Sequence, residues 1–126
     1  MSAVRPIVTV LAAAALVGVV GCSSDDDASP IAGADPHRAG EIADRYGCGS
    51  CHTIPGIQQA DGTVGPSLAA FADRGVLAGK FQMSVDNIVA WIMDPQAMDP
   101  GVAMPDMEVT KQDATDIAAY LLTLHK

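Results

Sequence analysis

One short stretch of the sequence has the residue types and spacing of a cofactor-attachment site, Cys48-Gly49-Ser50-Cys51-His52. Two thiols that are three positions apart near a helix end can reach the two vinyl groups of one porphyrin and form thioethers with it. The histidine that follows is then held under the iron, where it can act as an axial ligand. The pattern therefore predicts one covalent haem c, attached through Cys48 and Cys51 and ligated by His52.

Three other interpretations of this stretch compete with haem attachment. A structural zinc site needs four ligands, and outside the motif the chain has no second thiol pair and only His37 and His125 as further histidines. A thioredoxin-like dithiol is expected beside a βαβ unit, for which the sequence shows no pattern. The purely structural interpretation is a core histidine beside a disulfide. Covalent haem is the favoured interpretation.

The motif follows a segment that is predicted to be the first helix of the domain. Asp35-Pro36 is typical of an N-cap followed by proline at the first helical position, and apolar residues recur at helical spacing up to Tyr46. The region from Gly47 to Phe81 is rich in glycine and turn residues, with one short helix expected over 67–73. This region shows no alternating apolar pattern, so no strand is predicted in it.

Two longer helices are predicted after this loop region. Ser84 is a suitable N-cap for a helix over 85–93, which the Asp94-Pro95 pair should end before a second Gly/Pro-rich loop. Thr110, with Asp113 three residues later, resembles a capping box at the start of a last helix. One face of that helix is apolar and comprises Ala114, Ile117, Ala118, Leu121 and Leu124. The domain is therefore predicted to be all-α.

The predicted domain, residues 35–126, has few large apolar side chains with which to build a core. It contains only two Phe, two Tyr and one Trp. A core made from its own side chains would be modest and only marginally stabilising. We therefore expect another group, such as a haem, to fill the middle of the domain.

The residues before the domain are predicted to be an export signal followed by a lipid anchor. Residues 1–21 hold one cation, Arg5, and an apolar run that would be about 21 Å long as a helix, too short for about 30 Å of hydrocarbon. Val19-Val20-Gly21-Cys22 resembles a bacterial lipoprotein cleavage box, so Cys22 is the expected acylated N-terminus. The alternatives are an N-terminal anchor helix, or ordinary cleavage that leaves a free thiol. Small and acidic residues predict a flexible linker over 22–34.

The charge of the chain restricts its partners. Once the signal segment is removed, six basic residues face fifteen acidic ones, which gives a net charge of −9. Such a surface repels nucleic acid and anionic lipid headgroups, so binding to a polyanion is disfavoured as a function. A partner protein with a basic docking surface is favoured instead.

The order of these features resembles the class I, or mitochondrial-type, cytochrome c family over about residues 35–126. In that family, as here, an N-terminal helix precedes CxxCH, and a Gly-Pro-x-Leu segment, a helix with tryptophan, a Met-Pro loop and a C-terminal helix follow. Cytochrome c′-type bundles place the motif near the C-terminus instead. The resemblance implies a class I fold around one haem. It also implies that Gly40 allows the first and last helices to cross closely, with Tyr120 and Leu121 packed there.

The resemblance implies three further residues around the haem. Gly65-Pro66-Ser67-Leu68 is similar to the family segment whose proline carbonyl accepts the second ring N–H of the haem histidine, which orients that ligand. The alternative for Pro66 is a proline that merely opens a short helix. Arg74 is implied to pair with a haem propionate and Trp91 to lie near the same edge, because buried propionates need donors. Their alternatives are a solvated arginine and a core tryptophan.

The second axial ligand is implied to be a methionine of the loop before the last helix. Met104-Pro105 matches the family's Met-Pro signature, and Met98 is the alternative. Met83 and Met93 are more typical of core residues, and Met107 is too close to the last helix. A thioether that stays bound in both oxidation states keeps rearrangement small and leaves no open iron position. The expected iron ligands are therefore a histidine and a methionine.

Electron transfer is the function that the resemblance implies. The expected protein is a membrane-anchored monohaem carrier, exported to the periplasmic or another extracytoplasmic side, that serves respiratory or other membrane redox partners. One alternative is a fixed subunit of an oxidase or dehydrogenase, because residues 91–96 are reminiscent of cytochrome c domains attached to haem-copper oxidases. The other is a haem enzyme or gas sensor, which would need an open iron position.

Overall fold

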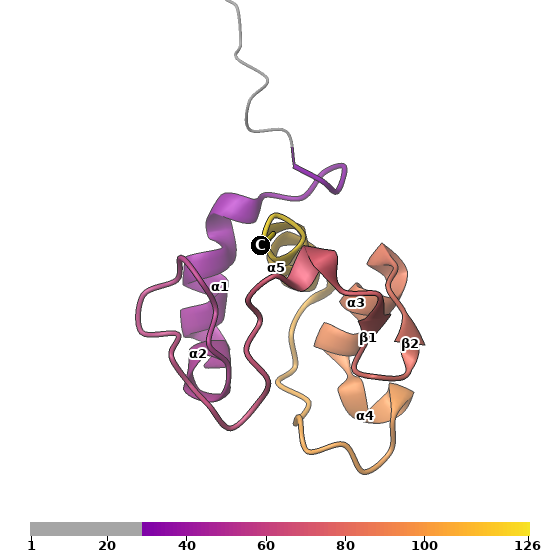
Figure 1. The fold of residues 1–126 in the computed structure, drawn as a ribbon. Helices are drawn as coiled ribbons and strands as arrows, with labels where there is room; N and C mark the ends of the chain where they lie inside the picture. The colour runs from indigo at the N-terminus through magenta and orange to yellow at the C-terminus, as the bar shows by residue number, and fades with distance from the viewer. Residues whose placement is uncertain (1–28) are drawn as a thin grey trace, which may run out of the picture.

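A computed structural model describes residues 29–126, in which short helices and loops gather around the C-terminal helix (Figure 1). The elements in chain order are η2 (Pro36–Arg38), α1 (Ala39–Arg45), α2 (Cys48–Cys51), η3 (Phe71–Asp73), β1 (Val76–Leu77), β2 (Phe81–Gln82), α3 (Val85–Met93), α4 (Pro95–Met98) and α5 (Lys111–Leu121). The predicted signal segment and Cys22 lie outside the described residues. Within the described part, none of the helices has the length and hydrophobicity needed to cross a bilayer.

The first helix begins where the sequence predicts it. The Oδ1 atom of Asp35 accepts the backbone N–H of His37 at 3.0 Å, and Pro36 takes the first helical position. The 3₁₀ turn η2 then continues into α1, which ends at Arg45. The buried side of α1, which belongs to the core that α5 also lines, comprises Ala39, Ile42 and Ala43.

The prediction that Gly40 allows the first and last helices to cross closely is wrong. Gly40 is exposed, and a Cβ built on it would meet no atom within 4 Å. Small side chains on the neighbouring face make the crossing instead. Ala39 and Ala43 on α1 and Ala114 and Ala118 on α5 are all buried in one core cluster. The spacing of alanines, rather than a glycine, therefore permits the close approach.

Two buried carboxylates of α5 bind the N-terminal helical segment. The residues Asp113 and Asp116 are only 5% and 1% exposed. Arg38 donates to Asp113 Oδ1 at 2.9 Å and also to Asp116 Oδ2. The Oδ2 atom of Asp113 also accepts from Arg45 at 3.1 Å and from the Tyr46 hydroxyl at 2.8 Å. Burying a carboxylate without a hydrogen-bond partner costs free energy. The N-terminal segment can therefore pack on α5 here only because it supplies these donors.

Local capping signals set the starts of the two longer helices. The Ser84 hydroxyl accepts the N–H of Asn87 at 3.3 Å at the start of α3, and that helix ends at Met93 as predicted. The Thr110 hydroxyl accepts the N–H of Asp113 at 3.2 Å at the start of α5. Both helices pack against each other and supply most of the remaining core.

The loop expected between α3 and α5 contains one further helix. Asp94-Pro95 ends α3 as predicted, but it also begins α4, since Asp94 Oδ1 accepts the N–H of Ala97 at 2.9 Å. The pair repeats the cap that Asp35-Pro36 forms at the first helix. A helix of one turn is too short to show an apolar period, so periodicity did not reveal it.

The fold is mostly helical, but it is not purely so. Val76 pairs with Gln82 and Leu77 with Phe81 in a two-stranded antiparallel hairpin, where no strand was predicted. The turn between the strands holds two consecutive residues at positive φ, 51° at Ala78 and 73° at Gly79. Two-residue strands are too short to show alternation, so the sequence pattern missed them.

Residues 29–34, the described end of the predicted flexible linker, form a turn on the surface of the domain. Ile31 is half-buried and packs against the core. Gln112 of α5 donates from Nε2 to the carbonyl oxygen of Gly33 at 3.4 Å. This part of the linker is therefore bound to α5, where a flexible coil was expected.

Replacement of Asp113 tests the carboxylate network. The hydrogen bond from Tyr46, with that from Arg38, lowers the pKa of the Asp113 carboxyl although burial raises it. A carboxyl with a lowered pKa stabilises the fold above its unfolded value of about 3.9, and this contribution is lost as the pH falls through the folded value. We expect Asp113→Asn to reduce the free energy of unfolding by roughly 1–3 kcal/mol at pH 7.

Urea unfolding at pH 7 and again below about pH 4 measures this effect, and the difference from the wild type should shrink at the lower pH. Asp86→Asn, which removes an exposed carboxylate from the start of α3, is the matched control and should change little. If Asp113→Asn lowered the free energy of unfolding equally at both pH values, the stabilising role of the ionised Asp113 carboxylate would be contradicted.

Candidate haem site

The CxxCH motif forms one helical turn directly after the first helix. Gly47 links α1 to α2 in a left-handed conformation with φ of 69°, which glycine adopts without strain. The His52 N–H donates to the Cys48 carbonyl at 2.9 Å, and the backbone at His52 is extended. Cys48 and Cys51 are both half-buried free thiols. Both thiols and the imidazole are therefore carried by one short segment.

A glycine-rich loop, residues 53–66, lies on this turn. The N–H of Gly62 donates to the Gly49 carbonyl at 3.0 Å, and that of Gly65 donates to the Cys51 carbonyl at 2.8 Å. A Cβ on Gly62 would lie 2.5 Å from backbone atoms of the motif, closer than real Cβ contacts. The loop and the turn are therefore held together backbone to backbone, at a spacing that a side chain would prevent.

The loop fixes the orientation of His52. The Nδ1 atom lies 2.7 Å from the Pro66 carbonyl oxygen. Since a carbonyl only accepts, the ring proton is assigned to Nδ1, and Nε2 keeps a lone pair for a metal. Gly65 packs against the ring, because a Cβ there would lie 2.6 Å from Cε1. The hydrogen bond between His52 and the Pro66 carbonyl was predicted from the Gly-Pro-x-Leu resemblance, and its role toward a haem remains a prediction.

The surroundings of the thiols fit covalent attachment better than metal binding or thiol exchange. Burial raises the pKa of the Cys48 thiol, which disfavours the reactive thiolate that thiol exchange requires. Among residues 29–126, no three His, Cys, Asp or Glu side chains are grouped as a metal site would require. The sheet described there is one antiparallel hairpin rather than a βαβ unit. Two thiols and an imidazole with a free Nε2 could hold a covalent haem.

The residues predicted near the haem propionates have protein contacts of their own. Arg74 donates from Nη2 to the carbonyl oxygens of Ser67 and Ala69, the latter at 3.3 Å. These hydrogen bonds hold the backbone of the segment that follows Pro66 in place. Trp91 is half-buried and packs against the core, with its ring 5.8 Å from that of Phe81. No contact described in the structure joins either side chain to His52.

The methionines fall into two groups. Met83 and Met93 are half-buried and pack against the core, as expected of structural residues. Met98 ends α4 and Met104 lies in the following loop, both half-buried outside the core cluster, whereas Met107 is 43% exposed. Figure 1 shows α2 on one side of the domain and α4 with its following loop on the other. The candidate methionines and the CxxCH motif therefore come from opposite sides.

One contact to the 53–66 loop was not evident from the sequence. The Tyr120 hydroxyl donates to the Pro55 carbonyl at 2.6 Å, and a Cβ on Gly56 would collide with this hydroxyl. Burial raises the pKa of Tyr120, so the hydroxyl keeps its proton and remains a donor. Tyr120 thus attaches the loop to α5. Helical spacing places Tyr120 on α5, but no local pattern indicates a partner so far back in the chain.

Comparison with known proteins defines the family. The family model for cytochrome c matches residues 38–125. The chain therefore belongs to the cytochrome c family. Membership implies a haem c cofactor, and Cys48, Cys51 and His52 fit the CxxCH motif by which it is attached.

Three similar curated proteins are each named cytochrome c oxidase subunit 2. Identity is 32% over 85 residues with the protein of Alkalihalophilus pseudofirmus, 28% over 91 residues with that of Bacillus sp. strain PS3, and 30% over 82 residues with that of Bacillus subtilis. The aligned parts cover 67%, 69% and 64% of this chain but only 24%, 26% and 23% of the three relatives. The chain thus spans about a quarter of the length of these relatives.

A methyl group at position 65 tests the contact between the loop and His52. Gly65→Ala places a Cβ against the imidazole ring, so the loop must shift, and we expect the free energy of unfolding to fall by roughly 1–3 kcal/mol. Gly75→Ala is the matched control, because a Cβ there meets no atom within 4 Å. Urea unfolding of the haem-loaded proteins measures both. Equal stability of the two variants would show that the loop does not pack on the ring.

Proposed function

We propose that this protein is a class I monohaem cytochrome c that carries single electrons at the outer side of a bacterial membrane. The observation that supports this best is the His52 imidazole, held by the Pro66 carbonyl next to two free thiols. A histidine whose second ring nitrogen is held by a carbonyl oxygen has one fixed tautomer, which suits a permanent iron ligand. The match to the cytochrome c family agrees with electron transport as the chemistry.

The residues of the chain would hold the electron-carrying group in one geometry. Haem iron supplies a one-electron change between its ferrous and ferric states when it is bound. Cys48 and Cys51 would retain the porphyrin through thioether bonds. His52 would keep one orientation in both oxidation states, because its Nδ1 is bound to a carbonyl of a loop that is itself fixed to the motif. Little rearrangement on a change of charge favours rapid electron transfer.

Met104 would supply the second iron ligand in this proposal, with Met98 as the alternative. Both are half-buried, and neither belongs to the core cluster that Met83 and Met93 pack against. Met104 has the Met-Pro context that class I proteins use. A thioether favours the reduced iron and closes the position where oxygen or peroxide would bind. This is why we favour a carrier over a haem enzyme or gas sensor.

Arg74 and Trp91 are assigned to the propionate edge of the haem. Arg74 uses Nη2 for the carbonyls of Ser67 and Ala69, and the remaining N–H groups of its guanidinium stay available to a carboxylate. Trp91 is half-buried and carries an indole N–H that a carboxylate can accept. In this arrangement one arginine would join the segment after Pro66 to the cofactor.

The attachment to the membrane is proposed from the sequence. Residues 1–21 would be a removed lipoprotein signal, Cys22 the acylated residue, 22–34 the linker and 35–126 the cytochrome domain. The cleavage-box resemblance before Cys22 supports the anchor. Export also agrees with covalent haem attachment, which takes place outside the cytoplasm. A lipidated cysteine with several acyl chains gives durable binding to a bilayer.

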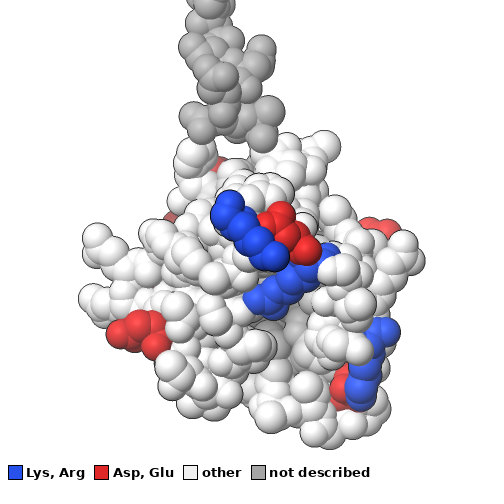
Figure 2. All heavy atoms as spheres, in the orientation of Figure 1, with Lys and Arg blue, Asp and Glu red and all other residues white. Residues whose placement is uncertain are grey.

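The partner in this proposal is a membrane redox complex with a basic docking surface. The face drawn in Figure 2 carries few charged side chains, and its basic groups lie beside acidic ones. Among the described ion pairs, Lys80 is joined to Asp99 at 2.7 Å. A face with few charges suits a short-lived complex with a redox partner. The charges around it would steer the approach of that partner. A second candidate is a fixed oxidase subunit, which the names of the three relatives favour.

Spectroscopy of the purified protein tests the cofactor and its ligands. We expect the reduced protein to show a c-type haem spectrum that carbon monoxide does not change at neutral pH. Met104→Ala should abolish the far-red methionine-to-iron charge-transfer band, and Met107→Ala, at an exposed position of the same loop, should retain it. Persistence of the band in Met104→Ala and its loss in Met98→Ala would show that Met98, rather than Met104, is the ligand. A colourless protein from a host that matures cytochromes would refute the proposal.

Membrane fractionation tests the anchor and the kind of partner. Cys22→Ser should move the haem-loaded domain to the soluble fraction, because the acylation site is lost. Ser23→Ala, beside it, is the control and should stay with the membrane. Unchanged membrane association of Cys22→Ser would refute the acyl anchor. Co-purification of the wild type with a stoichiometric copper or multi-haem complex in detergent would favour the fixed subunit over the mobile carrier.

A further inference from the structure

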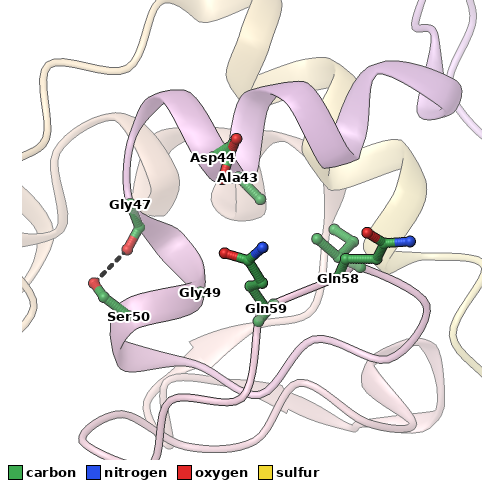
Figure 3. A pocket seen from close by; sticks show the side chains of 9 residues that line it. Ala43, Asp44, Gly47, Gly49, Ser50, Gln58 and Gln59 are labelled. Atoms are coloured by element: carbon green, nitrogen blue, oxygen red, sulfur yellow. Dashed lines mark hydrogen bonds between the residues drawn. The ribbon is translucent and has the colours of Figure 1, made fainter.

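A shallow pocket lies beside the CxxCH turn, between the end of α1, the turn itself and residues 57–60 of the loop (Figure 3). Its floor is apolar. Ala43 and Ala60 are buried there, and Ile57 is half-buried and packs against the core. The pocket also borders Gly49 and Ser50, the two residues between the predicted thioether cysteines. Whatever binds in it would touch the backbone of the motif.

The rim of the pocket is made of exposed oxygen-bearing side chains. Asp44 contributes a carboxylate, and Gln58 and Gln59 contribute amides. None of the ion pairs found among residues 29–126 includes Asp44, and no lysine, arginine or histidine lines the pocket. The rim therefore presents acceptors and a negative charge with no cation of its own beside them.

The rim is held in place by the backbone. Gln59 adopts a left-handed conformation with φ of 59°, which is costly for a residue with a side chain. A Cβ on Gly49 would lie 2.8 Å from the Ala60 Cα, so this part of the loop is pressed onto the motif. Figure 3 shows the Gln59 side chain pointing toward α1 across the pocket. The strained backbone thus presents this amide to the pocket.

We infer that this pocket binds a lysine side chain presented by the redox partner, with the aliphatic stem on the apolar floor and the ammonium group at the rim. Lysine buries its methylene stem along apolar surface while its head stays near water. An ammonium group has three donors, and the Asp44 carboxylate and the Gln59 amide oxygen offer acceptors for it. An anion would be repelled by Asp44, and an uncharged chain would gain nothing from its negative charge.

This inference rests on the proposed function in one respect, which is that the protein presenting the lysine exchanges electrons with this chain. The pocket borders the backbone between Cys48 and Cys51, so a lysine bound there would bring the partner against the segment that would carry the haem. The contact would then help to set the orientation of the encounter, in addition to the general acidic charge of the chain.

A titration with a lysine peptide tests the pocket on the haem-loaded full chain in detergent. We expect acetyl-Gly-Lys-Gly-amide to cause saturable NMR shifts in the Gln58 and Gln59 side-chain amides and in the Gly49 and Ser50 backbone amides. The same peptide with an acetylated lysine side chain should cause no such shifts. Asp44→Asn should weaken binding by up to about fivefold, the upper end of the range for one exposed ion pair.

Two further variants keep the test decisive. Asp86→Asn removes the same charge from α3 and should leave the affinity unchanged. Gln59→Gly removes one acceptor while it relieves the positive φ, so it should weaken binding without a loss of stability. Absence of shifts, equal shifts with the acetylated peptide, or equal weakening by both aspartate variants would overturn the inference. The haem spectrum of the same samples separates this outcome from failure of the proposed function.

Discussion

The backbone contact between the 53–66 loop and the CxxCH turn is the constraint on which the rest of the site depends. Gly62 and Gly65 donate to carbonyls of the turn at 3.0 and 2.8 Å, so the loop lies directly on it. That spacing puts the Pro66 carbonyl 2.7 Å from His52 Nδ1. The tautomer of the imidazole, and with it the free Nε2, follows from a packing distance that glycine alone permits.

The crossing of the N-terminal segment with α5 supports this arrangement. Apolar packing of small residues brings the helices together, and the buried pair Asp113 and Asp116 is satisfied by donors from the N-terminal side. Tyr120 of the same helix holds the loop through the Pro55 carbonyl. One helix therefore serves two tasks, because it closes the core and it anchors the loop that orients His52.

Features encoded within a few residues could be predicted from the sequence, and features that depend on distant contacts could not. Asp35, Ser84 and Thr110 act on backbone groups two or three positions away, so the helix starts were predicted correctly. The CxxCH motif is equally local. The hairpin and α4 are too short to show a period, and the direction that Gly40 faces depends on how two helices meet. The Tyr120 contact joins residues 65 positions apart, beyond any local pattern.

The turn over residues 29–34 also determines where a pull on the N-terminal side of the chain acts on the domain. Gly33 is bound to Gln112, and the Asp35 N–H donates to Asp116 Oδ1 at 2.9 Å, so the entering chain is fastened to α5 at two places. A pull from the N-terminal side loads these bonds first, and the rigid α5 helix takes up the force. The 53–66 loop is joined to α5 through Tyr120, further along the helix than Gln112 and Asp116, so tension on the chain would reach the loop only through α5.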